Sequence, residues 1–388
     1  MKLLRLPRAK VQIGTPLPWN VRDEHSVLLL SRGHIVETEH QLEALLRRGA
    51  FVDIEEVRAS ASVSAPSQAT VVARPLNLFG LWNQTAKNLK ALLDGAKPNG
   101  NFTEHIDLFA NHIVQLTDLN VDIGIYCSVR QDHEQHFYYG YNHALHTAGL
   151  CLLIARHLQW STERTMSLVK AALTMNMSIL ELQGQMAAQD GPLKDKQRVA
   201  IHAHPSETVA LLESLGVTDD SWLEAIMQHH ERSDGSGYPL GLTDFGEMAV
   251  ALRVADVFMA KISPRALRAA LTPIEAVRQL YQEDHGGPIS VAVVKSIGVH
   301  PPGDFVKLAS GELGVVVQRT KSASAPIVAS ITDTAGRPVT HTPRRDTCQA
   351  EFKIVGPATD KALLKRLPPE RLYGFSAVPA LPQMLATN

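Results

Sequence analysis

From about residue 75 to residue 285 the apolar residues recur every three or four positions, the spacing of one face of an α-helix. One such stripe consists of Ile106, Phe109, Ile113 and Leu116. A second runs through Leu168, Ala171, Met175, Ile179 and Leu182. Ser161 can cap this second helix, and Pro205 can open another that ends near Gly216. A stretch of this length predicts that an all-helical bundle forms most of the chain.

Both ends of the chain instead show short alternating segments. Between Lys10 and Arg58, HSVLLLSRG and AFVDIE look extended, whereas EHQLEALLRRG looks helical and is stopped by Gly49. After PPGD the alternation returns, with turns at Ser310-Gly311 and Ala335-Gly336. We therefore predict a mainly α chain with four parts. These are an α/β module at 1–58, a Ser/Ala/Pro-rich linker at 59–74, a helical domain at 75–298 and a β-rich extension at 299–388.

Charge and cysteine content exclude several classes of protein. The 38 Lys and Arg residues balance 39 Asp and Glu residues, so the chain lacks the positive field that binds nucleic-acid polymers. Its three cysteines form no CxxC pair, and its longest apolar stretch is too short to cross a bilayer. Pro7 and Lys10 interrupt any signal peptide. These features predict a cytoplasmic protein that contacts neither nucleic acid nor membrane.

The string HHERSDGSGYPLGL, which starts at His229, carries the most chemical information. Trp222 and Ile226 precede it at helical spacing, so the inner face of that helix delivers His229 and His230 to the core. The glycines and the proline that follow form a tight, rigid turn. Two adjacent histidines that face inwards favour metal ligation.

Three further segments complete the pattern: YNHALHTAGL with His143, IHAHPSETVALL with His204, and RVADVFMA with Asp256. Taken together, these segments resemble the HD-GYP family in content and order. The resemblance covers roughly Phe137 to Leu280, and a weaker likeness extends to the N-terminal module that often precedes such domains.

The resemblance implies an all-helical domain that hydrolyses cyclic di-GMP with two or three iron or manganese ions. The positions that match the family's metal ligands are His143, His204, His229, His230 and Asp256. Arg265 and Arg268 match basic residues that hold phosphate. The Gly237-Tyr238-Pro239 loop matches a segment that is linked in the family to binding diguanylate cyclase domains.

The chain departs from the family at its central motif, His-Asp-x-Gly-Lys. Met175 and Asn176 stand at the His-Asp positions, and Ile179 stands where the family has lysine. A neutral amide cannot bridge two cations as a carboxylate does, and a thioether is a poor ligand for iron or manganese. With Asp256 as the remaining acid, two dications would repel each other strongly. We therefore expect no paired metal centre, and the sequence leaves open whether the histidines hold one ion or none.

Three hypotheses follow for function. The preferred one is a catalytically silent regulator in bacterial cyclic di-GMP signalling that binds the nucleotide, a protein partner or both. The second is an active phosphodiesterase with a reduced metal site. The third is a purely structural adaptor in which Met175 and Ile179 pack the former site shut.

Each candidate residue also has a structural interpretation. Met175 is a core side chain, and Asn176 is a buried hydrogen-bonding residue. Arg265 and Arg268 form a solvated helix face, and His143 and His204 are satisfied core histidines. Three histidines that match no ligand position are interpreted as structural, namely His146, His157 and His202.

Overall fold

The fold was analysed in a computed structural model of the chain. It describes residues 3–8, a subset of positions between 11 and 56, and residues 77–373 apart from 99, 131–135, 285 and 359–366. The predicted linker at 59–74 lies outside the described residues. The chain divides into two compact units, Met1–Ala73 and Arg74–Asn388. The finer four-part division stays a prediction.

The first unit contains a small antiparallel sheet with the strand order β1-β4-β2-β3. Its strands are β1 (Leu3–Arg5), β2 (Val21–Arg22), β3 (Leu28–Leu30) and β4 (Phe51–Asp53). Residues 42, 43, 45 and 46 are helical, and Gly49 then adopts a φ of +77° before the chain enters β4. The sheet buries its own apolar cluster, which includes Trp19, Val21 and Val52.

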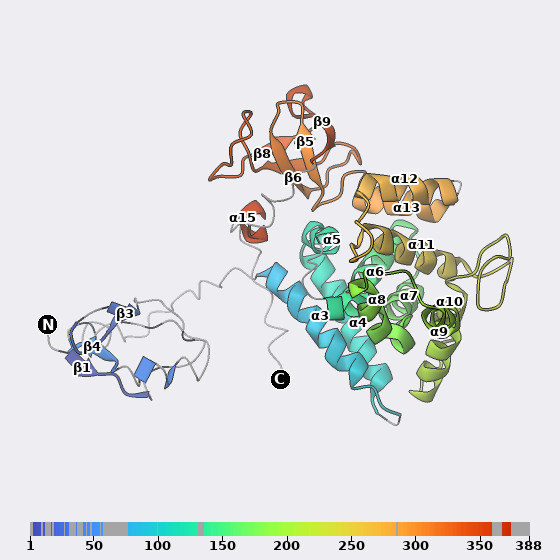
Figure 1. The fold of residues 1–388 in the computed structure, drawn as a ribbon, viewed down its shortest axis with the longest axis horizontal. Helices are drawn as coiled ribbons and strands as arrows, with labels where there is room; N and C mark the ends of the chain where they lie inside the picture. The colour runs from blue at the N-terminus through green and yellow to red at the C-terminus, as the bar shows by residue number, and fades with distance from the viewer. Residues whose placement is uncertain are drawn as a thin grey trace. The chain divides into compact units, whose positions relative to one another are not determined.

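The second unit is mainly helical, as predicted (Figure 1). Its longer helices are α3 (Leu78–Asp94), α4 (Phe102–Leu119), α5 (Val121–Val129), α6 (Tyr139–His157), α7 (Thr162–Thr174), α8 (Leu180–Ala188), α9 (Asp195–Ser214), α10 (Asp220–Gln228), α11 (Glu247–Ile262), α12 (Pro273–Glu283) and α13 (Pro288–Ile297). Two single turns, η2 (His136–Tyr138) and η3 (Met177–Ile179), precede α6 and α8. α13 carries the helical region past residue 285, where the sequence pattern ended. Among the described helices, none is long and apolar enough to span a bilayer.

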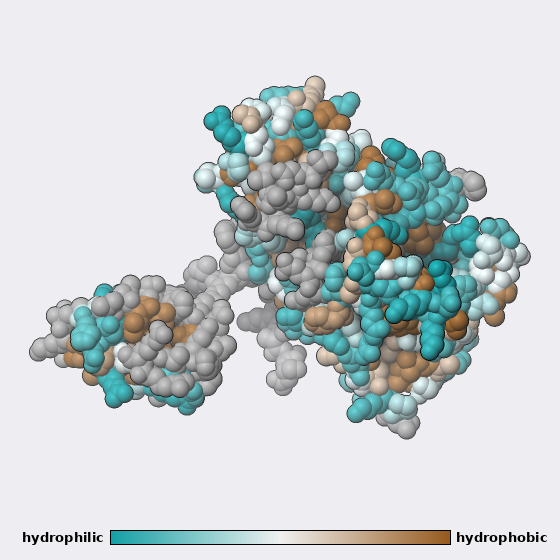
Figure 2. All heavy atoms as spheres, viewed as in Figure 1, coloured by the Kyte–Doolittle hydropathy of each residue, from teal (hydrophilic) through white to brown (hydrophobic). Residues whose placement is uncertain are grey.

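Helix α6 is the centre of the bundle. It lies against α3, α4, α5, α7, α8, α11 and α13, and 14 of its 19 residues are buried. A helix buried on nearly all sides has almost no polar face, so the histidines in its middle point into the protein. By contrast, α12 is amphipathic, and Figure 2 shows hydrophilic residues over its outer face. The burial of α6 is what places His143 and His146 inside the fold.

Two sequence predictions about helix ends are wrong. The stripe from Leu168 to Leu182 is not one helix, because α7 ends at Thr174 and the chain turns through η3 before α8. Ser178 anchors this turn to α9, where its hydroxyl contacts Thr208 (2.9 Å) and donates to the carbonyl of His204 (3.3 Å). Pro205 does not open a helix either, since it lies inside α9. The apolar spacing continues through the end of α7 and through Pro205. Hydrogen bonds in the folded chain, and not this spacing, set the helix boundaries.

The C-terminal extension contains an antiparallel sheet with the order β8-β7-β6-β5-β9. Its elements are β5 (Phe305–Leu308), β6 (Leu313–Gln318), β7 (Ile327–Ser330), β8 (Arg344–Asp346), η4 (Ala350–Phe352) and β9 (Ile354–Pro357), followed by α15 (Pro369–Tyr373). The sheet shares the main apolar core of the helices, to which Phe305 and Val315 contribute. Arg319 also pairs with Asp122 of α5 and donates to a backbone carbonyl of α13. Sheet and bundle therefore pack as one unit.

Candidate metal centre

Three histidines from two segments meet in the helical bundle. His204 lies on α9, while His229 and His230 follow the last residue of α10. One ring nitrogen from each lies within 4.8 Å of the others. The Nε2 atoms of His204 and His229 are 3.3 Å apart. In the sequence these residues are related only because each matches a motif position. In the structure they lie in one cluster.

The backbone fixes which nitrogen two of the imidazoles turn to the cluster. Pro205 has no N–H for the carbonyl of Ile201, and the Nδ1 of His204 donates to that carbonyl instead (2.6 Å). The carbonyl of Ile226 is free because α10 ends at Gln228, and the Nδ1 of His229 donates to it (2.6 Å). A carbonyl oxygen only accepts, so the hydrogen is on Nδ1 in both rings. Each Nε2 therefore presents a lone pair when the ring is neutral.

Burial keeps these rings neutral. It lowers the pKa of His204 to about 3, lowers the pKa of His229, and lowers that of His230 well below its ordinary value. Two bare Nε2 lone pairs 3.3 Å apart cannot hydrogen-bond to each other. A tetrahedral ion with nitrogen ligands at about 2.0–2.1 Å separates two such nitrogens by about 3.3 Å. The nitrogens of His204 and His229 are therefore spaced for one metal ion, and His230 offers a third candidate ligand within 4.8 Å.

His143 and Asp256 form a second pair beside this cluster. The Nε2 of His143 donates to Oδ1 of Asp256 at 2.6 Å, and both side chains are largely buried. Burial alone would raise the pKa of Asp256, but the hydrogen bond and charge of His143 hold it well below its usual range. His229 and His230 also act on this carboxylate electrostatically. The five matched ligand positions thus share one region, and two of them bond to each other. The Nδ1 of His143 is buried without a partner among the described residues.

The two positions that lack the His-Asp motif lie at the end of α7. Met175 is fully buried in the main apolar core, as its structural interpretation predicted, and Ile179 is 6% exposed. Asn176 is also buried, and within the described part of the chain its side-chain amide makes no hydrogen bond. Two residues later Ser178 contacts the His204 helix, so this turn lies beside the histidine cluster. The turn contributes no anionic ligand.

Arg265 and Arg268 do not lie on a helix face, which corrects that interpretation. They occupy the loop after α11 and bond to each other's backbone. The Nε and Nη2 of Arg265 donate to the hydroxyl of Tyr139 (3.0 and 2.8 Å), and the ring of Tyr139 stacks on His143. Arg268 donates to the carbonyl of Ala260. Neither guanidinium pairs with a described carboxylate, so both positive charges stay available to an anion.

The Gly-rich loop is held in place from inside. Glu231 is fully buried, and its two oxygens accept the N–H groups of Leu240 (2.7 Å) and Leu242 (2.8 Å). A Cβ on Gly237 would come within 2.5 Å of the backbone at Glu231, which only glycine permits. Tyr238 stacks on His230 and on His202, so its ring faces the site, whereas Leu240 is 60% exposed.

We expect Glu231→Gln to lower the free energy of unfolding by about 2–3 kcal/mol. The amide keeps one acceptor oxygen and turns an NH₂ group toward a backbone N–H, so one buried donor loses its partner. Urea denaturation measures the change. Asp244→Asn removes an exposed carboxylate from the loop between α10 and α11 and should leave the denaturation midpoint unchanged. Equal midpoints for wild type and Glu231→Gln would contradict this prediction.

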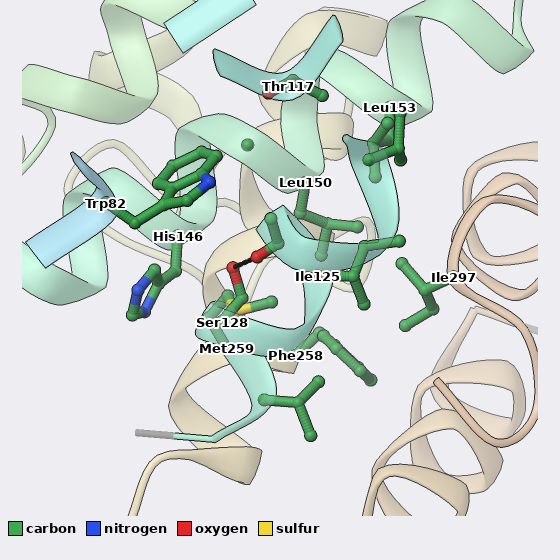
Figure 3. A pocket seen from close by; sticks show the side chains of 14 residues that line it. Trp82, Thr117, Ile125, Ser128, His146, Leu150, Leu153, Phe258, Met259 and Ile297 are labelled. Carbon is green, nitrogen blue, oxygen red and sulfur yellow. Dashed lines mark hydrogen bonds between the residues drawn. The ribbon is translucent and has the colours of Figure 1, made fainter. Parts of the chain in front are cut away.

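His146 lies one turn along α6 from His143 but faces a different space. It lines a cavity of about 20 Å³ with Trp82, Ile125 and Phe258, among other side chains (Figure 3). The Nδ1 of His146 and the Nε1 of Trp82 are buried without a partner among the described residues. A cavity of this size holds about one water molecule. His146 therefore belongs to the core, as predicted, and not to the metal cluster.

Burial lowers the pKa of His146 to about 3, which makes folding sensitive to acid. The unfolded chain takes up this proton near pH 6.5, so the contribution is complete above 6.5 and is lost as the pH falls toward 3. His146→Leu should reduce the loss of unfolding free energy between pH 6.5 and pH 5 by about 2 kcal/mol. Chemical denaturation at both pH values measures this. His157→Leu, at an exposed position, is the control, and an equal acid response in both variants would refute the assignment.

Three residues of the site were not assigned a functional role from the sequence. Tyr139 orients Arg265, Glu231 holds the loop, and His202 stacks on Tyr238 although the sequence interpreted it as structural. His202 and His204 are two residues apart and therefore lie on different faces of α9. This spacing did not predict that both would lie near Tyr238. A glutamate directly after two inward-facing histidines was the one available signal for Glu231.

Part of the chain is similar in sequence to known proteins. Residues 126–286 match the family model for an HD domain. A cyclic di-GMP phosphodiesterase of Pseudomonas aeruginosa is 28% identical over 47% of this chain and 45% of its own length. A cyclic di-GMP phosphodiesterase response regulator of Xanthomonas campestris is 31% identical over 36% of each chain. A 3'3'-cGAMP-specific phosphodiesterase of Vibrio cholerae is 30% identical over 34% of this chain and 29% of its own.

The chain spans less than half the length of these relatives. Among solved structures, an HDG"Y"P protein of Bdellovibrio bacteriovorus aligns with a TM-score of 0.43 and 16% identity. That alignment covers 75% of this chain and 98% of the other.

Proposed function

Since residues 126–286 belong to the HD domain family, we propose that this chain serves bacterial cyclic di-GMP signalling by binding nucleotide or protein partners, without hydrolysing the nucleotide at an ordinary enzymatic rate. The buried Met175 and the neutral Asn176 at the end of α7 carry this proposal. Relatives that match part of this chain are named as phosphodiesterases of cyclic dinucleotides, which supports the ligand class.

The ligand set limits the site to one ion. Asp256 is the one carboxylate among the matched positions, and it is hydrogen-bonded to His143. Without a second carboxylate to bridge them, two dications at short range would repel each other strongly. The His204, His229 and His230 cluster supplies three neutral nitrogens, which suit a single iron ion. When bound, such an ion would supply a Lewis acid that polarises phosphate oxygen.

Anion binding does not depend on the missing motif. Arg265 and Arg268 come from the loop after α11, and neither charge is neutralised by a described carboxylate. Tyr139 fixes the guanidinium of Arg265 next to His143 and Asp256. A planar guanidinium can donate to two oxygens of one phosphate. These contacts support retention of a nucleotide pocket without hydrolysis.

Metal content, nucleotide binding and turnover should be measured on one anaerobic preparation. We expect at most one ion per chain, heat on titration with cyclic di-GMP, and no linear dinucleotide or GMP. Arg265→Ala should weaken the binding, while Arg278→Ala, an exposed arginine on α12, should not. Two ions per chain together with turnover at an ordinary enzymatic rate would overturn the proposal. Absence of heat with wild type would leave protein contacts alone as its mode of action.

The intact histidine cluster favours one alternative, an active phosphodiesterase with a mononuclear site. Product formation that depends on the single bound ion would establish it. The adaptor hypothesis rests on the burial of Met175 and Ile179, and it requires that neither metal nor nucleotide binds. For a protein partner such as a diguanylate cyclase domain, the exposed Leu240 is the contact that the Gly-rich loop offers, because Tyr238 packs inwards.

A further inference from the structure

Helix α11 carries a second charged side chain toward the site. Arg253 precedes Asp256 by three residues, so the two lie on the same face of the helix. The Nε of Arg253 is fully buried and has no hydrogen-bond partner among the described residues. No ion pair to its guanidinium occurs in that part of the chain either. Arg253 is therefore a partly buried cation without a partner.

Its charged neighbours come from three elements. The guanidinium of Arg253 interacts electrostatically with His230, and with Arg232 and Asp234 in the Gly-rich loop. Glu283 and Asp284, at the end of α12, are the remaining neighbours. Oδ2 of Asp284 is itself buried without a partner, so a buried acid and a buried base lie near each other without an ion pair. Burial lowers the pKa of Arg253, yet a guanidinium stays protonated at neutral pH.

An unpaired guanidinium at such a position costs stability, because its lost hydration is not replaced. Groups held at such a cost occur mostly where a ligand or a reaction uses them. The missing partner must be an acceptor that carries negative charge. The planar fork of arginine matches the oxygens of a phosphate group better than a single carbonyl does.

We propose that Arg253 binds a phosphate-type oxyanion at the histidine site. Its fixed positive charge there compensates the negative charge of the phosphate oxygens, in place of a second metal ion. This assignment rests on the proposed function for the identity of the anion as part of a cyclic dinucleotide. It adds a residue from α11 to the two arginines of the following loop. It supplies positive charge for phosphate at a site that lacks the carboxylate needed to hold a second metal ion.

Arg253→Met tests the proposal, because it keeps the length of the side chain and removes the charge. We expect affinity for inorganic pyrophosphate, measured by calorimetry, to fall at least about tenfold, which is about 1.4 kcal/mol. The melting temperature should stay equal or rise, since an unpaired buried charge is gone. Arg253→Lys should retain part of the affinity. Arg232→Met removes an exposed arginine from the neighbouring loop, and it should change the affinity less than about twofold.

A second titration, with cyclic di-GMP, separates this proposal from the proposed function. Unchanged pyrophosphate affinity in Arg253→Met would overturn the role of Arg253, even if wild type binds the nucleotide. Pyrophosphate binding that requires Arg253, without nucleotide binding, would support Arg253 and refute the nucleotide. Wild type that binds neither would refute both. Equal losses of stability in Arg253→Met and Asp284→Asn, with pyrophosphate affinity intact, would show a structural ion pair instead.

Discussion

The double variant Met175→His/Asn176→Asp should bind a second metal ion and hydrolyse cyclic di-GMP at least about 100-fold faster than wild type. That gain corresponds to about 2.7 kcal/mol of transition-state stabilisation, within the range that preorganised charge supplies. The new carboxylate can bridge two cations, which the amide cannot. Metal analysis and product formation, measured on anaerobic protein, give the result directly.

Stability provides an independent readout for this variant. Both positions are buried, so an aspartate and a histidine placed there without metal lose hydration that nothing replaces. The metal-free variant should therefore melt below wild type, and Mn²⁺ or Fe²⁺ should raise its melting temperature. Wild type should respond less, because it gains at most one ion. A ligand that binds only the folded state stabilises it in proportion to its affinity.

The matched control combines the double variant with His229→Ala. This triple variant has the restored motif but lacks a member of the histidine cluster, so turnover should return to the wild-type level. A double variant that folds, takes up no second ion and shows unchanged turnover would refute our explanation for silence. The cause of silence would then lie elsewhere, for example in Ile179 or in access to the site.

The second large effect is expected for His229→Ala, which should weaken Fe²⁺ binding at least about 100-fold. Loss of residues that merely orient a ligand already costs about 10- to 100-fold, and His229 itself offers the lone pair. Its Nε2 faces that of His204 at 3.3 Å. Titration of the metal-free protein with Fe²⁺ under argon measures the affinity.

Two further variants distinguish the loss of a metal ligand from misfolding. His229→Gln retains most of the volume of this fully buried side chain and should lose metal affinity while remaining folded. His157→Ala removes an exposed histidine at the end of α6 and should leave the affinity unchanged. Equal affinities of wild type and a folded His229→Gln would refute the three-histidine site.

Much of the helical bundle could be predicted from the sequence, because the buried residues of a helix recur every three or four positions. The spacing of Ile106, Phe109 and Ile113 predicted α4, and all three residues are buried. Ser161 accepts a hydrogen bond from the N–H of Arg164 and caps α7, as predicted. The wrong predictions concern positions where the apolar spacing continues but contacts in the folded chain set the helix boundary. Pro205 sits inside α9, where the ring of His204 takes over the carbonyl that the proline cannot reach.

The chemical character of the site was also visible in the sequence, but its internal arrangement was not. The Gly-rich string and the loss of the His-Asp pair identify residue types at fixed positions. Distances, tautomers and burial arise from segments far apart in the chain. Thus the sequence could not show that Asp256 is paired with His143, or that Arg253 has no partner.

By itself the amino-acid sequence determined the helical class, the family resemblance and the absence of the carboxylate that bridges two metals. These properties depend on residue identity and local spacing. Only the tertiary structure decided that three imidazoles converge, that those of His204 and His229 turn their Nε2 lone pairs inwards, and that an unpaired guanidinium stands near them. Both depend on which helices pack against one another, because desolvation and short-range charge act between atoms that the fold brings together.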